Sequence, residues 1–321
     1  MIIRKDIQKI VKEYTSNVTI GIFGSHSAKE IGMAAKKSDF RTVIIVEEGR
    51  DQFYTNYHSH LYDEIIVVKK FRDILNKNVQ NKLLELNTIF IPNRSFSVYV
   101  GYDGIENKFK VPIYGNRNIL RSEDRKDGKG QYYLLKKAGI RTPKKVIKPE
   151  DIDRLCIVKV QQAKNILERA FFYVNSFDDF KLQSQDLINK KIINKDGLED
   201  ARIEEYVLGS RFNANFHGYG LIDKFCDFDL VGFSDRRQVN LQGFLNLPAR
   251  DQLKINTPIK NEEIGHYGIT MRESKQHLVF DAANRFRKVV KEEYDVGMIG
   301  PFSLQGAIAY NPDNELEFVV F

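Results

Sequence analysis

The sequence predicts a mixed α/β and α+β fold, in which a parallel sheet comes first and antiparallel sheets follow. In the first hundred residues, short and continuous apolar runs alternate with amphipathic stretches. This is the pattern of a parallel sheet whose strands are joined by helices and covered on both faces. Later in the chain the apolar runs return in pairs across short turns, as the strands of antiparallel hairpins do.

The N-terminal part reads as a βαβ domain that ends near residue 115. It opens with an amphipathic helix, and a polar turn follows the first strand. The strands are expected at residues 17–24, 41–47, 64–69 and 88–92, and the helices at 1–14, 25–40 and 74–86.

A second domain, residues 116–321, follows a highly charged stretch, and we expect it to divide into two subdomains near residue 200. Its last strands flank Asn-Pro-Asp-Asn, which is typical of a hairpin turn. The strands are expected at residues 156–160, 170–174, 202–208, 211–219, 225–232, 302–310 and 316–321, with a loop at 256–268 and a helix at 274–293.

Charge and composition favour small anionic ligands. The chain has 50 Lys and Arg against 43 Asp and Glu, which gives a net charge of +7. This suits nucleotides, but the charges are spread and form no basic, aromatic-interleaved platform, so a nucleic-acid partner is not predicted. Basic residues do crowd residues 117–137, where intervening acids indicate a solvated helical face.

Cysteine use and the N-terminus predict a cytoplasmic protein that does not enter a membrane. Cys156 and Cys226 lie far apart and lack metal-ligand spacing, which suits a reducing compartment. The first residues form an amphipathic helix rather than a signal peptide, and no apolar run reaches the length of a membrane span.

A candidate anion site follows the first strand, at Gly24, Ser25, His26 and Ser27. A turn between a strand and a helix directs backbone N–H groups and the positive helix end at an anion. A plain helix cap explains the same residues, and the turn has one glycine and no lysine, unlike a full P-loop. Ser95 and its neighbour Arg94 follow the strand at 88–92, and strands of an open parallel sheet bring such residues close to His26.

Three further positions carry chemistry. Lys159 stands between two valines in a strand, where burial is costly unless the ammonium meets an anion. Glu204 and Glu205 are adjacent in a strand, so one points inward and the other outward. Gln305 is polar within an apolar strand, where it either holds a metal or phosphate or faces solvent from an edge.

Seven blocks, in this order, carry a resemblance to a known family over nearly the whole chain. They are GSHSA at 24–28, IPNRSF at 91–96, VPIYGNRNILR at 111–121, IEEYVLG at 203–209, NLQGFLNLPARDQ at 240–252, MRES at 271–274 and GMIGPFSLQ at 297–305. The sequence resembles the archaeal formate-dependent formaminoimidazole carboxamide ribonucleotide synthetases of purine synthesis, which belong to the ATP-grasp superfamily. The resemblance implies an N-terminal preATP-grasp domain followed by a two-subdomain ATP-grasp fold.

The resemblance also implies a carbon–nitrogen ligase. ATP activates formate as formyl phosphate, and the amine of aminoimidazole carboxamide ribonucleotide then attacks it. The implied cofactors are ATP with Mg²⁺ or Mn²⁺, the implied substrates are small molecules, and the implied assembly is a homo-oligomer. Carried over by position, the implied residues are His26, Ser27, Ser95 and Asn240 for the ribonucleotide, Lys159, Glu204, Glu205, Tyr206, Val207 and Asp229 for ATP, Gln305 for the metal, and Lys159 with Asn240 for catalysis.

Three departures from the family pattern leave a second hypothesis open. The segment 161–169 contains no glycine where the family has a glycine-rich phosphate loop, although Lys164 and Arg169 offer side-chain charge instead. Arg237-Gln238-Val239 replaces a Tyr-Glu-Ser type of sequence. Phe321 ends the sequence where a second metal carboxylate is expected, so either the sequence is truncated or the protein lacks half its metal site. The alternative is a divergent paralogue with another carboxylate–amine ligation or only a nucleotide-binding regulatory role.

Overall fold

The computed structural model describes residues 1–124, 128–160, 170–221, 227–239, 241–255, 263–294 and 296–321. The chain divides into two compact units. Unit 1 consists of Met1–Leu134, His217–Asp229 and Arg287–Phe302, and unit 2 of Leu135–Phe216, Leu230–Phe286 and Ser303–Phe321. The domain boundaries expected near residues 115 and 200 stay a prediction.

Unit 1 contains the predicted parallel sheet, with strand order β3-β2-β1-β4. In register, Ile22 of β1 lies between Ile44 of β2 and Ile91 of β4. The ends of β1 and β4 therefore meet at one edge of the sheet. The elements are α1 (Arg4–Glu13), β1 (Thr19–Phe23), α2 (Ala28–Lys37), β2 (Arg41–Glu47), β3 (Glu64–Val68), α3 (Lys77–Glu85), β4 (Thr88–Ile91), α4 (Arg94–Val100) and α5 (Tyr102–Asn107).

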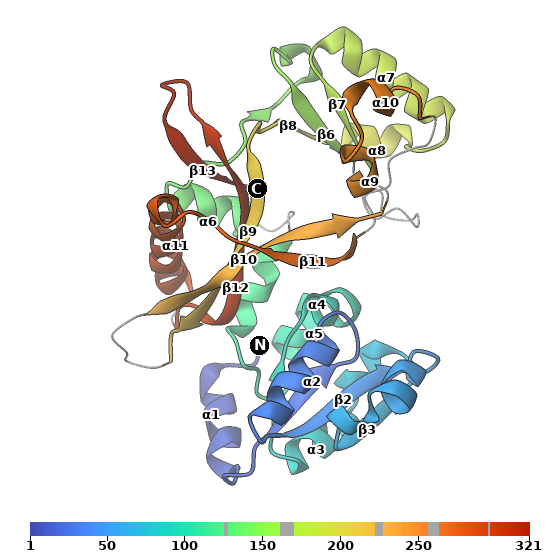
Figure 1. The fold of residues 1–321 in the computed structure, drawn as a ribbon. Helices are drawn as coiled ribbons and strands as arrows, with labels where there is room; N and C mark the ends of the chain where they lie inside the picture. Colours follow the sequence, from blue (N-terminus) through green and yellow to red (C-terminus); the bar gives the residue numbers. More distant parts are fainter. Residues whose placement is uncertain (125–127, 161–169, 222–226, 240, 256–262, 295) are drawn as a thin grey trace. The chain divides into compact units, whose positions relative to one another are not determined.

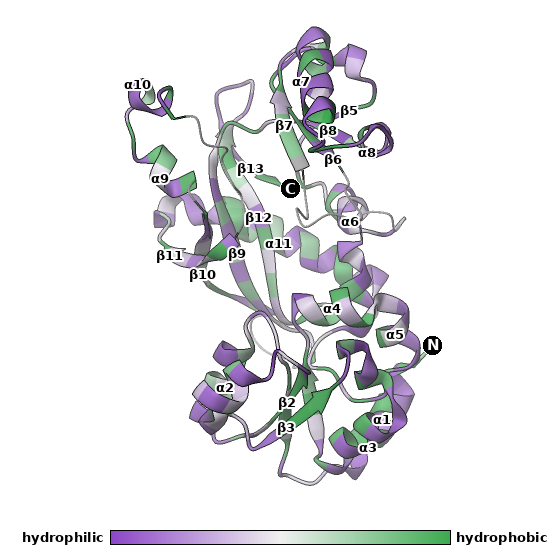
Figure 2. Cartoon of the chain, turned by 90° about the vertical axis from the view of Figure 1, so that its right-hand side faces the viewer, coloured by the Kyte–Doolittle hydropathy of each residue, from purple (hydrophilic) through white to green (hydrophobic). Residues whose placement is uncertain are grey.

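Both faces of this sheet are covered, as the continuous apolar runs predict. On one face, side chains such as Phe23 and Ile45 pack with residues of α3, α4 and α5 in one core. On the other face, Ile22 and Ile44 pack with Ala28 of α2. Figure 1 shows the helices around the strands of this sheet, and Figure 2 shows β2 and β3 coloured as hydrophobic.

The helix expected at residues 74–86 is interrupted. A short 3-10 helix spans Phe71–Leu75, and α3 begins at Lys77. Asn76 lies between them with an extended backbone, at φ −67° and ψ 141°. One apolar pattern therefore holds two helical segments, and the Asn76 side chain does not cap the second of them.

The first antiparallel sheet belongs to unit 2 and has the strand order β5-β8-β6-β7. Its core packs Val158 and Ile203 against Phe180 of α7. Residues that alternate with these, among them Lys159 and Glu204, lie on the opposite face. The elements are β5 (Lys145–Val146), β6 (Cys156–Val160), β7 (Ala170–Val174), α7 (Phe177–Asn189), α8 (Lys195–Glu199) and β8 (Arg202–Glu205).

The second antiparallel sheet has the order β11-β10-β9-β12-β13, and its strands β9, β10 and β12 contribute residues to both units. Alternate residues Phe212, Ala214 and Phe216 of β9 are buried, as their spacing predicts. The elements are α6 (Gln131–Lys137), β9 (Ser210–Tyr219), β10 (Phe228–Gln238), α9 (Leu241–Leu245), α10 (Ala249–Gln252), β11 (Glu263–Ile269), α11 (Glu273–Glu293), β12 (Ile299–Tyr310) and β13 (Leu316–Val320).

The strand expected at 225–232 is present as β10, which begins at Phe228 and continues to Gln238, while residues 225 and 226 lie outside the described residues. The loop expected at 256–268 was wrong in its described part, because Glu263–Ile269 forms the strand β11. Gly265 and Gly268 pair with residues of β10 in an antiparallel ladder, which makes this segment a strand. No helix among the described residues is long and apolar enough to span a membrane.

Candidate active site

The turn after β1 approaches its neighbouring strand closely. The N–H of Gly24 donates to the carbonyl oxygen of Ile45 over 2.7 Å. A side chain at position 24 would place its Cβ 2.6 Å from Val46 Cγ1 and 2.7 Å from that same oxygen. Glycine is therefore required for this contact, and it fixes the start of the turn.

His26 and Ser27 follow at the beginning of α2. Ser27 has a left-handed backbone, at φ 66°, and its side chain does not cap the helix. Its Oγ lies 2.8 Å from Nδ1 of His26 instead, and the His26 side chain is exposed. The Ser27 side chain therefore does not form the plain helix cap that the sequence left possible.

Asn93 joins this turn to the segment between β4 and α4, and Ser95 lies in the first turn of α4. Its Nδ2 donates to the carbonyl oxygen of His26 over 2.8 Å and to that of Phe23 over 3.2 Å, while its Oδ1 caps α4 by accepting from Phe96 N. Unit 1 therefore brings the half-buried Ser95 and the turn to one edge of the sheet. The sequence reasoning missed Asn93, although an asparagine just before a helix is a recognisable cap signal.

In unit 2, Lys159 meets the anion that its position requires. Its Nζ donates to Oε2 of Glu204 over 2.5 Å, and Arg202 Nε donates to Oε1 of the same carboxylate. Lys159 lies directly opposite Arg202 in the β6–β8 ladder. One carboxylate thus holds two cations side by side.

Glu204 is fully buried at 0% exposure. Burial alone would raise the pKa of its carboxyl, but the charge and hydrogen bond of Lys159, together with Arg202, outweigh burial, so the net pKa is lowered. Glu204 is consequently ionised at neutral pH. With Lys159 and Arg202 protonated, the three side chains carry a net charge of about +1.

The residues after Glu204 form a tight connection to β9. Glu205 points to the other side, where Arg141 Nη2 donates to it over 3.1 Å, and Tyr206 N donates to the carbonyl oxygen of Leu155. Val207 is buried against Ala307 and Val319. The opposite orientations expected for Glu204 and Glu205 are confirmed.

Asp229 is in unit 1, where Tyr219 Oη donates to its Oδ2 over 2.8 Å. Asp229 therefore has a tyrosine partner that the sequence did not predict. Asn240, expected as a ribonucleotide contact and catalytic group, lies outside the described residues, as does the segment 161–169 with Lys164 and Arg169.

Gln305 is exposed, and β12 lies between β9 and β13, so it is not on an edge strand. Its Oε1 accepts from Arg236 Nη2 over 2.9 Å, and Arg236 Nε lies 3.3 Å from Glu263 Oε2. An amide oxygen is a ligand that magnesium accepts, but a guanidinium at hydrogen-bond distance repels a second cation. The described arrangement therefore does not fit a metal at Gln305 unless Arg236 moves.

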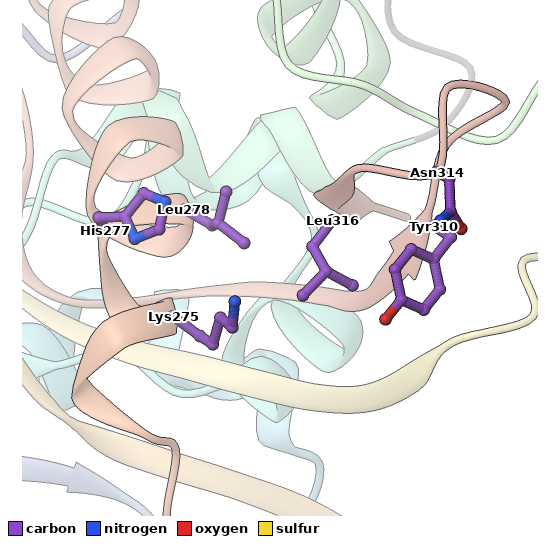
Figure 3. A pocket seen from close by; sticks show the side chains of 6 residues that line it. All are labelled: Lys275, His277, Leu278, Tyr310, Asn314 and Leu316. Carbon is purple, nitrogen blue, oxygen red and sulfur yellow. The ribbon is translucent and has the colours of Figure 1, made fainter.

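The pocket drawn in Figure 3 lies elsewhere in unit 2, between α11 and the β12–β13 hairpin, and has a volume of about 390 Å³. It is lined by Lys275, His277, Leu278, Tyr310, Asn314 and Leu316. None of these is a predicted site residue. A groove of about 450 Å³ along α2 in unit 1 likewise lacks them. His26, Ser27 and Ser95 lie instead at the edge of the parallel sheet, and Lys159 and Glu204 lie on the face of the β5-β8-β6-β7 sheet opposite α7. Asp229 and Gln305 lie on β10 and β12 of the other antiparallel sheet.

A parallel sheet followed by two antiparallel sheets defines the ATP-grasp fold, and solved structures bear this out. A PurP protein of IMP biosynthesis from Thermococcus kodakaraensis aligns over 94% of this chain and 83% of its own, with a TM-score of 0.66 and 24% identity. An N5-carboxyaminoimidazole synthetase from Staphylococcus aureus aligns over 94% and 68%, with a TM-score of 0.59 and 14% identity. A biotin carboxylase domain from Hydrogenobacter thermophilus, solved with MgADP, aligns over 95% and 63%, with a TM-score of 0.58 and 13% identity.

Sequence relatives define the family within that class. A 5-formaminoimidazole-4-carboxamide-1-(beta)-D-ribofuranosyl 5'-monophosphate synthetase from Methanocaldococcus jannaschii is 38% identical over 100% of this chain and 86% of its own length. One from Methanopyrus kandleri is 36% identical over the same shares. Family models described as "Protein of unknown function (DUF1246)" and "Domain of unknown function (DUF1297)" match residues 20–146 and 179–321. The chain belongs to the family of these synthetases.

Proposed function

We propose that this protein is an ATP-dependent ligase that formylates aminoimidazole carboxamide ribonucleotide with formate. The observation that carries the proposal is identity of 38% over the whole chain to a synthetase whose name specifies the formamido product. The grouping of His26, Ser27 and Ser95 at one sheet edge supports it. Their place, after the strands of a parallel sheet, is where ligands of open α/β folds bind.

The reaction that we propose proceeds in two balanced steps. An oxygen of formate takes the γ-phosphoryl group of ATP, which gives formyl phosphate and ADP. The substrate amine then attacks the formyl carbon, the bond to phosphate breaks, and the amine loses a proton. The products are the formamide, ADP and inorganic phosphate, and the protein contributes chiefly by positioning and by stabilising charge.

In this proposal the unit 1 turn holds the ribonucleotide. The N–H groups at the start of α2 and the exposed ring of His26 suit its 5'-phosphate, and Ser27, Ser95 and Asn240 are further contacts. Asn93 fixes the turn through the backbone oxygen of His26. Because that contact is to backbone, Asn93 is a positioning residue rather than a substrate ligand.

ATP is assigned to Lys159, to the segment 204–207 and to Asp229. Lys159 supplies positive charge to the phosphates, residues 204–207 contact the adenine, and Asn240 joins Lys159 as a catalytic group. Mg²⁺ or Mn²⁺ would accompany ATP and neutralise its phosphates, and Gln305 would be a protein ligand once Arg236 releases it. We further propose that the protein is cytoplasmic and forms a homo-oligomer. Light scattering of the purified protein would measure the oligomeric state.

The test is a turnover assay on the complete protein with ATP, formate and aminoimidazole carboxamide ribonucleotide, in which formamide and phosphate are both measured. We expect equal amounts of both, and no formamide when formate is omitted. The glycine-free sequence of 161–169 favours the paralogue as a second candidate, so other small carboxylates replace formate in parallel reactions. Turnover with another carboxylate alone, or ribonucleotide binding without any turnover, would overturn the assignment of formate ligation.

A further inference from the structure

Two cations share one buried carboxylate on the face of the β5-β8-β6-β7 sheet that lies opposite α7. Lys159 and Arg202 are paired across β6 and β8, and Glu204 accepts one hydrogen bond from each on separate oxygens. The sequence reasoning assigned Lys159 to the phosphates of ATP and did not single out Arg202. The ladder places the guanidinium beside the ammonium, which sequence spacing alone does not reveal.

We propose that Arg202 is a second phosphate-binding cation, which acts with Lys159 on the polyphosphate of ATP. This inference rests on the proposed ATP site and extends it. Lys159 and Arg202 side chains are 24% and 27% exposed, whereas Glu204 is not exposed at all. A ligand can therefore reach the cations but not the carboxylate that holds them.

The charge balance favours an anion of high charge. The formal charges of Lys159, Arg202 and the ionised Glu204 sum to about +1 at neutral pH. A nucleoside carries no charge, whereas each phosphate of a nucleotide brings negative charge next to Lys159 and Arg202. Affinity gained from Arg202 should thus grow with the number of phosphates on the nucleotide.

The sequence gives an independent reason for a second cation. Residues 161–169 contain no glycine, the residue that most readily lets a backbone approach a phosphate closely. Arginine provides several donors in a rigid fork that matches phosphate oxygens. Arg202 supplies from β8 the hydrogen-bond donors that a glycine-rich loop supplies from its backbone.

The same geometry assigns Glu204 a positioning role. Its two oxygens accept from Arg202 and Lys159, and its carboxyl lies out of reach of solvent. Glu204 therefore acts on ATP through the two cations, not by a carboxylate contact to adenine.

The experiment compares calorimetric titrations of the full chain with adenosine, AMP, ADP and ATP. The variants are Arg202→Gln and Arg202→Lys, and Lys181→Gln is the matched control because it removes a cation from α7, which packs on the other face. We expect Arg202→Gln to weaken ATP and ADP by about tenfold or more, which corresponds to about 1.4 kcal/mol, and adenosine by less than twofold. Arg202→Lys should recover part of the loss, and Lys181→Gln should change nothing.

The outcomes separate the inference from the function on which it rests. If Arg202→Gln weakens adenosine and ATP equally, Arg202 has a purely structural role. If ATP affinity is unchanged, Arg202 does not contact the phosphates. Either result overturns the inference but leaves the proposed function standing. If the unaltered protein binds no adenine nucleotide, the proposed function fails and the inference fails with it. Circular dichroism of each variant identifies any that does not fold. If Arg202→Gln does not fold, the nucleotide affinities of Arg202→Lys decide whether the inference holds.

Discussion

Replacing Glu204 with glutamine should destabilise unit 2 by about 3 kcal/mol at neutral pH. Removing one partner of a buried ion pair typically costs about 3–5 kcal/mol, because an uncompensated charge stays behind. Glu204 is fully buried, but Lys159 and Arg202 are about a quarter exposed and can turn toward water. This partial escape places the expected cost at the lower end of that range.

The cost should depend on pH in a defined direction. The pKa of Glu204 is lowered in the folded protein, because Lys159 and Arg202 outweigh the effect of burial. A carboxyl with a lowered pKa stabilises the fold above its unfolded pKa, near 4.3, and this stabilisation is lost as the pH falls through the folded value. The difference between the protein and Glu204→Gln should therefore be constant from about pH 8 to pH 5 and shrink below about pH 4.

Urea unfolding followed by circular dichroism measures the free-energy difference at each pH. Hydrogen exchange of peptides from β6 and β8 shows whether the loss is local to this sheet. Glu199→Gln is the matched control, since Glu199 ends α8 in the same unit with an exposed side chain. A loss below 1 kcal/mol at neutral pH, or a difference that stays constant down to pH 3.5, would refute the argument that Glu204 is held ionised by the two cations.

Three further changes test other parts of the molecule. His26→Ala should weaken aminoimidazole carboxamide ribonucleotide at least tenfold and leave ATP unaffected in calorimetry, and equal loss of both ligands would contradict a substrate contact. Gly24→Ala should lower the urea-unfolding free energy by about 1–3 kcal/mol through its contact with Ile45, whereas Gly243→Ala, where an added methyl meets nothing, should not. Arg236→Gln should lower the Mg²⁺ concentration needed for half-maximal ATP binding, and an unchanged Mg²⁺ titration would mean that Arg236 does not compete for Gln305.

The parallel sheet was predictable because its signal is local. Buried strands such as β2 are continuous apolar runs, and each needs only its own residues to be recognised. The strand β11 was missed for the opposite reason. Its seven residues include two glycines and a histidine, and its backbone pairing with β10 makes it a strand. Local propensity cannot report such a partner.

The candidate site shows the same limit at the level of side chains. The sequence identified His26, Lys159 and Gln305, because polar groups in turns and apolar strands stand out. It did not identify Asn93, whose role depends on a backbone oxygen 67 positions away. It also did not identify Arg202, whose role depends on the register between β6 and β8. Polar side chains that stand out in the local sequence were thus easier to predict than side chains whose role depends on a distant partner.

The two units handle charge in different ways, and this bears on how the proposed reaction is ordered. In unit 1 the turn at His26 is organised by Asn93 and by backbone groups, which stay neutral. In unit 2 the carboxylate of Glu204 keeps Lys159 and Arg202 together before any nucleotide arrives. Cations that are already in place need little reorganisation when the γ-phosphoryl group passes from ATP to formate. Such preorganisation lowers the barrier of a step in which charge is redistributed. Within the proposed function, the charges of unit 2 therefore favour the phosphoryl-transfer step, and the turn of unit 1 serves ribonucleotide binding.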